Sequence, residues 1–347
     1  MLTGRWTAVL TLVAVLAGGY PGQAGTVTYE IVPVGNAGNA NDTTGFGAVA
    51  YEYGIGKYDV TIGQYTAFLN AVDPGGTNPY SVYSTSMASN ANSAGISFTS
   101  GAPTGSKYAA MSGSTNRPIT YVSWFDAARF ANWMQNGQGS GSTETGAYTL
   151  VGGQTSGTAP AKNAGASFYI PTENEWYKAA YYDPTKSGSG GYWTYATLSD
   201  TAPGNTIGNS VNQANYRTGA GYSVTQSSSY SSSQNYLTDV GAFAGSVSFY
   251  GTFDQSGNVF QWNDLSGASA SFRGARGGSW DYGDSHVAFL SSSGRHFEMQ
   301  LDAENSNVGF RLAVSAVPEI DPAGTGSVLA LVAGALALIE RRRLKVA

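Results

Sequence analysis

Glycine-containing turn pairs lie close to large aromatic residues in the last third of this chain, and this pattern most constrains its fold. The pairs Gly257–Asn258 and Gly277–Gly278 each precede a tryptophan, Trp262 and Trp280. Such pairs allow sharp turns and bring two backbone segments close together. The large rings can fix the intervening loops onto a core. The sequence therefore predicts an ordered structure in which long loops are anchored by aromatic side chains.

The composition is that of an ordered domain with a neutral polar surface. Charged residues make up 11% of the chain and aromatic residues 13%, whereas disordered segments are depleted in aromatic side chains. The net charge of −5 argues against the basic surface that binds nucleic acid, so we expect no nucleic-acid partner. The chain has no cysteine, which rules out disulfides, thiolate nucleophiles, zinc–thiolate sites and iron–sulfur clusters.

Three helix starts are marked by residues that can cap a helix. Thr61 precedes an apolar stripe, Ser123 opens a capping-box pattern, and Thr172 opens a second one before the expected helix Glu173–Tyr182. The polar segment Tyr80–Asn116 is expected to be a long surface loop. Short strands are expected at Thr26–Val34, Tyr51–Val60, Thr143–Leu150 and Ser167–Ile170. The sequence therefore predicts an α+β fold with few helices, short strands and long loops.

Residues 1–24 have the layout of a secretory signal peptide. Arg5 supplies a positive charge, Thr7–Ala17 is a short apolar segment, and the small residues Gly22 and Ala24 fit cleavage after Ala24. A buried N-terminal helix is the alternative, and it is disfavoured because a polar, strand-like segment follows at once. We therefore expect the protein to be exported.

Residues 317–347 combine a short polar motif, an apolar run and a cluster of arginines. As a helix, Ala323–Ile339 would rise about 1.5 Å per residue and just cross a membrane core, with the arginines on the cytoplasmic side. A permanent tail anchor and a core helix are alternatives, and the second is disfavoured because the run has no polar face. The layout resembles a PEP-CTERM sorting signal of Gram-negative bacteria, although Ile320 and Glu340 depart from the usual pattern.

The resemblance of the tail implies a route for the protein. A single transmembrane helix at residues 323–339 would hold it briefly at the inner membrane. An exosortase-type sorting enzyme would then remove the tail. The mature protein would reach the cell envelope or the extracellular polysaccharide matrix, where a polysaccharide or a surface protein is the expected partner.

A series of short motifs runs in a fixed order along most of the chain. They include Arg117–Trp133, Tyr169–Ala180, Val240–Phe243, Asp254–Trp262, Arg273–Tyr282 and Gly309–Ala313. In this order they resemble the formylglycine-generating enzyme family, also called the sulfatase-modifying factor family. The resemblance implies an elaborated C-type-lectin-like fold over residues 25–316. Within it, Arg276 and Arg311 are expected to be buried or half-buried and to donate hydrogen bonds to loop carbonyls.

The chemistry of that family depends on two cysteines that bind copper, and this chain lacks both. Counting from Arg276, their positions fall on Tyr282 and Val287. Neither side chain is a soft copper ligand or a thiol capable of disulfide exchange. We therefore expect no copper and no formylglycine generation. Arg295 falls where the family has an arginine that borders the cleft, so the cleft is expected to persist without its redox chemistry.

The resemblance also implies calcium, which the family binds through asparagine and aspartate side chains and backbone carbonyls. The matching positions are Asn215, Tyr216, Asp239 and Gly241 for one site, and Asn258 and Val259 for a second. Gln261 replaces the usual glutamate of the second site. Calcium prefers several carboxylates, so the loss of this charge is expected to weaken that site. A simple turn residue is an equally good interpretation of Asn258.

Two classes of function compete. The first is a non-enzymatic surface module that binds a glycan or a protein, and the sequence favours it. Its candidate cleft residues are Trp280, Asp281, Tyr282, His286 and Arg295, for which packing and loop support are the alternative role. The second is an oxidoreductase that uses a different metal site in the same cleft. An iron site built on His286 and His296 has no support from their spacing.

Overall fold

The computed structural model describes residues 26–266 and 270–315 of the chain. The chain divides into two units, Met1–Ser315 and Ala316–Ala347. The predicted signal peptide at residues 1–24 and the predicted transmembrane run at residues 323–339 lie outside the described residues. Within the part that is described, no helix is long and apolar enough to cross a membrane.

Three of the helices begin where the sequence predicts. The α-helices of the described chain are Ile62–Val72 (α1), Ser86–Ser89 (α2), Trp124–Gln135 (α3) and Glu173–Tyr181 (α4). Thr61, Ser123 and Thr172 each accept a hydrogen bond from a backbone N–H three residues on, and the side chain at that position bonds back. Each capping box satisfies two backbone donors at its helix start. Short 3-10 helices lie at Val151–Gly153, Lys186–Gly188 and Asp284–Leu290.

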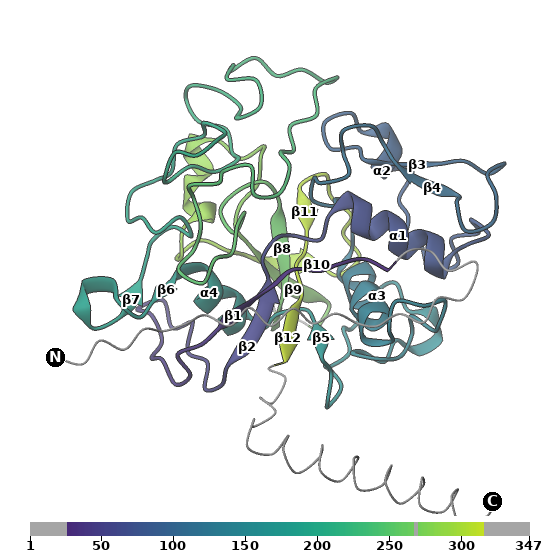
Figure 1. Cartoon of the computed structure of the whole chain (residues 1–347), viewed down its shortest axis with the longest axis horizontal. Coiled ribbons are helices and arrows are strands. Elements are labelled where there is room, and N and C mark those ends of the chain that lie inside the picture. The colour runs from purple at the N-terminus through teal and green to yellow at the C-terminus, as the bar shows by residue number, and fades with distance from the viewer. Residues whose placement is uncertain (1–25, 267–269, 316–347) are drawn as a thin grey trace, which may run out of the picture. The chain divides into compact units, whose positions relative to one another are not determined.

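Short strands form two four-stranded sheets and two hairpins (Figure 1). The first sheet has the order β1 (Ile31–Val34), β2 (Tyr53–Gly56), β12 (Ala313–Ser315) and β5 (Phe168–Tyr169). The second has the order β10 (His296–Gln300), β9 (Phe272–Arg276), β8 (Phe260–Ser266) and β11 (Val308–Gly309). The hairpins pair β3 (Ile96–Phe98) with β4 (Tyr108–Ala110) and β6 (Tyr182–Asp183) with β7 (Gly191–Tyr192). Only β8 and β11 pair in parallel among these strands, and the whole is the predicted α+β class.

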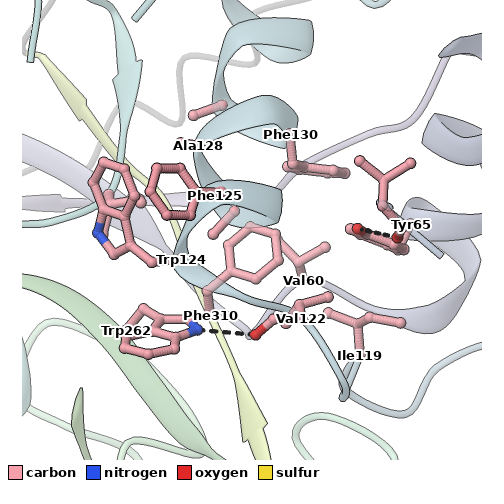
Figure 2. Close-up of a cluster of buried hydrophobic side chains, with 14 of the residues drawn as sticks. Val60, Tyr65, Ile119, Val122, Trp124, Phe125, Ala128, Phe130, Trp262 and Phe310 are labelled. Carbon is pink, nitrogen blue, oxygen red and sulfur yellow. Dashed lines mark hydrogen bonds between the residues drawn. The ribbon is translucent and has the colours of Figure 1, made fainter. Parts of the chain in front are cut away.

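Aromatic side chains from the helices and the sheets meet in the main core (Figure 2). Tyr65 of α1 stacks on Phe130 of α3 with 6.0 Å between ring centroids, and Phe130 contacts Phe310 edge-on at 5.4 Å. Trp262 of β8 is buried in the same core, and its Nε1 donates to the carbonyl of Val122 at 3.0 Å. This core joins α1 and α3 to the second sheet.

The segment Tyr80–Asn116 is not the predicted surface loop. It contains α2 and the β3–β4 hairpin. Ile96 and Tyr108 are buried in the main core, and the Tyr108 hydroxyl donates to the carboxylate of Asp73. The prediction was wrong because Ser, Asn and Gly dominate the composition of this segment. The few apolar residues that pack in the core are too widely spaced to form a recognisable pattern.

Two expected strands also differ from the structure. Thr143–Leu150 forms no strand. The side-chain amide of Asn132 in α3 instead donates to the backbone carbonyls of Thr143 and Tyr148 and accepts from the backbone N–H of Tyr148. Thr26–Val34 is a strand only over its last residues. Earlier in that segment, the side-chain amide of Gln138 accepts from the backbone N–H of Val27 at 2.6 Å and donates to its carbonyl at 3.1 Å. In both places a side-chain amide replaces the expected strand partner.

Arg311 is fully buried, as predicted, at the junction of the first sheet and the loops. Its Nη2 lies 2.9 Å from Asp59 Oδ1, and its Nε donates to Gln261 Oε1 at 2.7 Å. The same guanidinium donates to the carbonyls of Gly56 and Phe253 at 2.9 and 2.7 Å. One side chain therefore connects segments that are far apart in the sequence.

A buried carboxyl in the capping box of α3 is expected to make stability depend on pH. Burial raises the pKa of Asp126 to about 7, although hydrogen bonds from Ser123 oppose the shift. The folded state therefore binds this proton more tightly than the unfolded chain, in which the pKa is near 3.9. The stabilisation is complete at acid pH and is lost as the pH rises through about 7, with a slope of at most about 1.4 kcal/mol per pH unit.

Thermal denaturation between pH 5.5 and pH 8 checks this expectation. The melting temperature of the wild-type protein should fall across this range. Asp126→Asn retains an oxygen that can accept from Ser123 but cannot titrate, so it should flatten the fall. Equal slopes for the two proteins would contradict the assignment to Asp126.

Candidate binding pocket

An open pocket of about 560 Å³ lies beside the second sheet. Its lining comprises Phe260, Phe272, Tyr282, Met299, Gln300, Ala303, Asn305 and Asn307. The volume falls within the range of about 300–1,000 Å³ that is typical of small-ligand sites. The lining joins apolar side chains to three side-chain amides, and a few polar groups among apolar ones can fix the orientation of a ligand.

Strand pairing brings these residues together. Gln300 of β10 pairs with Phe272 of β9, and Phe260 of β8 pairs with Val308 of β11. The connection from β10 to β11 supplies the rest of one wall. It is held because the carbonyl of Asn305 accepts the backbone N–H of Tyr121 at 3.0 Å. The pocket is therefore built on paired strands, with one bonded loop at its edge.

Three aromatic rings form a corner at the pocket wall. Tyr282 meets Phe260 at 5.0 Å between ring centroids and an angle of 82°, and meets Phe289 at 5.3 Å and 90°. Phe260 and Phe289 also meet edge-on, at 5.9 Å. Edge-to-face pairs of this kind are favourable beyond the area that they bury. The ring of Tyr282 is therefore held in place before any ligand arrives.

A carboxylate lies behind the amide wall of the pocket. Asn307 Nδ2 donates to both carboxylate oxygens of Asp281, at 3.1 and 3.2 Å, and the hydroxyl of Ser279 donates to the same group at 2.6 Å. Burial, and to a smaller extent the charge of Asp281, raise the pKa of Tyr282. The phenol therefore stays protonated at neutral pH, able to donate and to accept a hydrogen bond.

The other predicted cleft residues lie in different surroundings. Trp280 is buried, and its ring stacks on Tyr236 at 5.1 Å and 6°, so it does not line this pocket. The Nη1 of Arg295 lies 3.8 Å from Glu173 Oε1, and its guanidinium lies 4.6 Å from the centre of the Phe46 ring. The side chain of His286 lies outside the described residues. Of the five candidates, Tyr282 lines the pocket and Asp281 supports its wall.

The two positions inferred for the family's cysteines lie in different surroundings. Tyr282 is in the pocket wall, whereas Val287 packs against an apolar cluster that contains Tyr195, Tyr216 and Leu290. The wall residues that the sequence did not single out are Phe260, Phe272, Met299, Gln300, Ala303, Asn305 and Asn307. Phe260 belongs to a recognised motif, but no local pattern joins it to Asn305 and Gln300.

Two of the calcium candidates take part in a buried network of amide hydrogen bonds. Asn215 Nδ2 donates to the Tyr236 carbonyl and to Asn258 Oδ1, both at 3.0 Å. Asn258 Oδ1 also accepts the backbone N–H of Thr238 at 3.3 Å, and Asn258 Nδ2 donates to the Thr238 carbonyl at 3.2 Å. A Cβ atom on Gly257 would lie 2.4 Å from the Asn215 carbonyl, so only glycine allows this approach. The network joins the loop that contains Asn215 to the loop that contains Asn258 through direct hydrogen bonds.

The remaining calcium candidates differ in exposure and in their hydrogen bonds. Asp239 is exposed, Val259 is a buried apolar residue, and the N–H of Gly241 donates to Asp254 Oδ2 at 2.7 Å. The Tyr216 carbonyl accepts from an asparagine amide. Across the described side chains there is no group of three or more His, Cys, Asp or Glu residues arranged to hold a metal. Calcium binding at these positions stays a prediction.

Comparison with known proteins assigns the chain to a family. A sequence model of the sulfatase-modifying factor enzyme 1-like domain matches residues 24–316. The chain belongs to this family. No curated protein matches it. Membership agrees with the order of the motifs and confirms the predicted fold class.

Solved structures with similarity to this sulfatase-modifying factor domain are distant in sequence. One, described as the crystal structure of CarF, is 20% identical with a TM-score of 0.49, and the match covers 84% of this chain and 99% of that chain. Treponema denticola variable protein 1 is 19% identical with a TM-score of 0.48, covering 84% and 97%. PvdO from Pseudomonas aeruginosa is 15% identical with a TM-score of 0.40, covering 83% and 92%.

Proposed function

We propose that this chain is a non-catalytic, ligand-binding member of the sulfatase-modifying factor family that is exported to the cell surface or matrix. The observation that carries the proposal is Tyr282. It occupies the position inferred for the first cysteine, and its ring forms a wall of the open pocket. A glycan or a protein segment held in this pocket would be the ligand.

The side chains at the site favour binding over thiol chemistry. The chain has no cysteine to serve as nucleophile or copper ligand. The phenol of Tyr282, with its raised pKa, is a poor nucleophile at neutral pH but a good surface for stacking and hydrogen bonding. An oxidoreductase with another metal site is the alternative, and no observation among the described residues favours it.

The ends of the described fold are compatible with processing and export. Val27 is already bonded to Gln138, so a cut after Ala24 would leave these contacts intact. The strand β12 ends at Ser315, so removal of the tail from residue 317 would leave β12 whole. We propose the route described above, through an exosortase-type enzyme to the envelope or matrix of a Gram-negative bacterium.

The test uses the processed protein purified from culture. A sulfatase-type peptide incubated with it and copper should show no conversion of cysteine to an aldehyde. A screen of glycans, matrix polysaccharide and surface proteins should find a ligand whose affinity falls roughly tenfold in Tyr282→Ala, because an aromatic contact is lost.

The matched control is Tyr230→Ala, which removes an exposed tyrosine that does not line the pocket. It should bind the ligand like the wild-type protein, and both variants should keep the wild-type circular dichroism spectrum. Aldehyde formation, or equal ligand binding by wild type and Tyr282→Ala, would contradict the proposed function.

A further inference from the structure

We infer that the pocket binds the uncharged ring of a sugar. This inference rests on the proposed function and narrows it to one class of ligand. It depends on three properties of the lining: a fixed aromatic corner, a set of side-chain amides, and the absence of charged groups among the described lining residues.

The aromatic corner offers a surface for the apolar face of a pyranose. Tyr282 is fixed by edge-on contacts with Phe260 and Phe289, and Phe260 and Tyr282 both line the pocket. Phe272, which is half-buried like Tyr282, adds further apolar surface, whereas Phe260 and Met299 are buried and support these two side chains. A pyranose carries several C–H groups on one face, and burying them against rings removes apolar area from water. Because the rings are already held in position, little conformational entropy is lost on binding.

The amides supply partners for sugar hydroxyls. Gln300 and Asn305 are exposed at the pocket, and Asn307 is half-buried behind them. A side-chain amide has two donor hydrogens and an acceptor oxygen in one plane, so it can bond to two neighbouring hydroxyls at once. Asn307 Nδ2 is already engaged by Asp281, which orients its carbonyl oxygen as an acceptor.

The charges around the pocket exclude acidic sugars. Among the described lining residues there is no lysine or arginine, and Asp281 accepts hydrogen bonds from Asn307. A uronic acid or sulfated sugar would therefore lose hydration without gaining a cation, and it would approach a carboxylate. The protein as a whole carries a net charge of −5, which acts in the same direction.

The experiment measures binding of simple glycosides to the processed protein by calorimetry and by saturation-transfer NMR. The probes are the methyl glycosides of glucose, galactose and mannose, with methyl glucuronide and a sulfated hexoside as acidic counterparts. At least one neutral glycoside should bind with a Kd on the order of 1 mM, and the acidic pair should bind at least tenfold more weakly.

Variants at Asn305 test the role of the amide wall, because its side chain is exposed and its loop is held by backbone bonds. Asn305→Ala should weaken the neutral glycoside roughly three- to tenfold, as expected for one or two lost hydrogen bonds. Asn305→Lys should lower the Kd for methyl glucuronide at least tenfold relative to the wild-type protein, because it adds a cation at the pocket. Asn305→Asp is the matched control and should show no such gain.

The outcomes separate this inference from the proposed function. Equal binding of neutral and acidic glycosides by the wild-type protein would overturn the inference. The inference would also be overturned if the protein bound an aromatic peptide or a surface protein but no sugar, and if Tyr282→Ala abolished that binding. That result would leave the proposed function standing. If no ligand of any class depends on Tyr282, both fail.

Discussion

Replacing Arg311 by methionine is expected to lower the free energy of unfolding by about 3–5 kcal/mol. The guanidinium is fully buried and pairs with Asp59, which is also fully buried. Without it, Asp59 would have to carry a charge in the interior with no cation beside it, or take up a proton at a cost that grows with pH. Methionine fills similar space, so the loss would come from the unpaired carboxylate and from the carbonyls of Gly56 and Phe253 that lose their donor.

The pH dependence of this variant gives a second readout. Burial raises the pKa of Asp59 to about 8 even with Arg311 present, and Arg311 opposes that shift. Removing Arg311 should raise the pKa further. Protonation would relieve the unpaired charge at lower pH, so the destabilisation should be larger at pH 9.5, where the wild-type Asp59 is ionised, than at pH 6.

Urea denaturation of three proteins checks the expectation at both pH values. They are the wild-type protein, Arg311→Met, and the double variant Asp59→Asn with Arg311→Met. The double variant should recover part of the loss at pH 9.5, because it removes the buried carboxyl that the single variant leaves without a cation. If the single and double variants have the same midpoint, the unpaired carboxylate is not the cause.

Trp262→Ala is expected to destabilise the domain by about 3–5 kcal/mol. The indole is fully buried where β8 meets the main core, and its Nε1 donates to the carbonyl of Val122 (Figure 2). Truncation would leave a large cavity and an unsatisfied buried carbonyl. Trp262 also anchors β8 in the core, one residue beyond Gln261 and two beyond the pocket residue Phe260. Its loss should therefore loosen the pocket wall as well.

The matched variant Trp262→Phe separates the two contributions. It keeps most of the ring volume but cannot donate to Val122, so it should cost about 1–3 kcal/mol. Urea midpoints, with slopes to confirm two-state behaviour, provide the measurement. A Phe variant as unstable as the Ala variant would show that the hydrogen bond, and not the packing, dominates.

The sequence predicted those parts of the fold that depend on local chemistry. Thr61, Ser123 and Thr172 cap helices because each needs only a partner three residues on. The burial of Arg276 and Arg311 followed from their place in recognised motifs. These interactions depend on neighbours along the chain, or on a pattern that the family shares.

The sequence did not predict the composition of the pocket, because its walls are assembled from distant segments. Gln300 reaches the pocket through pairing of β10 with β9, and Asn305 through a loop bonded to Tyr121. Proximity along the chain was also a poor guide. Trp280 is two residues from Tyr282, yet the turn between them directs the indole onto Tyr236.

The last strand of the described chain lies inside the first sheet. β12 pairs with β2 on one side and β5 on the other, so these two strands meet no partner there until residue 315 has been made. A nascent chain that emerges amino end first cannot close this sheet, and must keep two strand edges open until β12 has been made. Closure then depends on contacts between residues more than 140 apart in sequence, which makes it slow. For the export proposed above, late closure of this kind would give a translocation channel time to thread the polypeptide before the sheet forms.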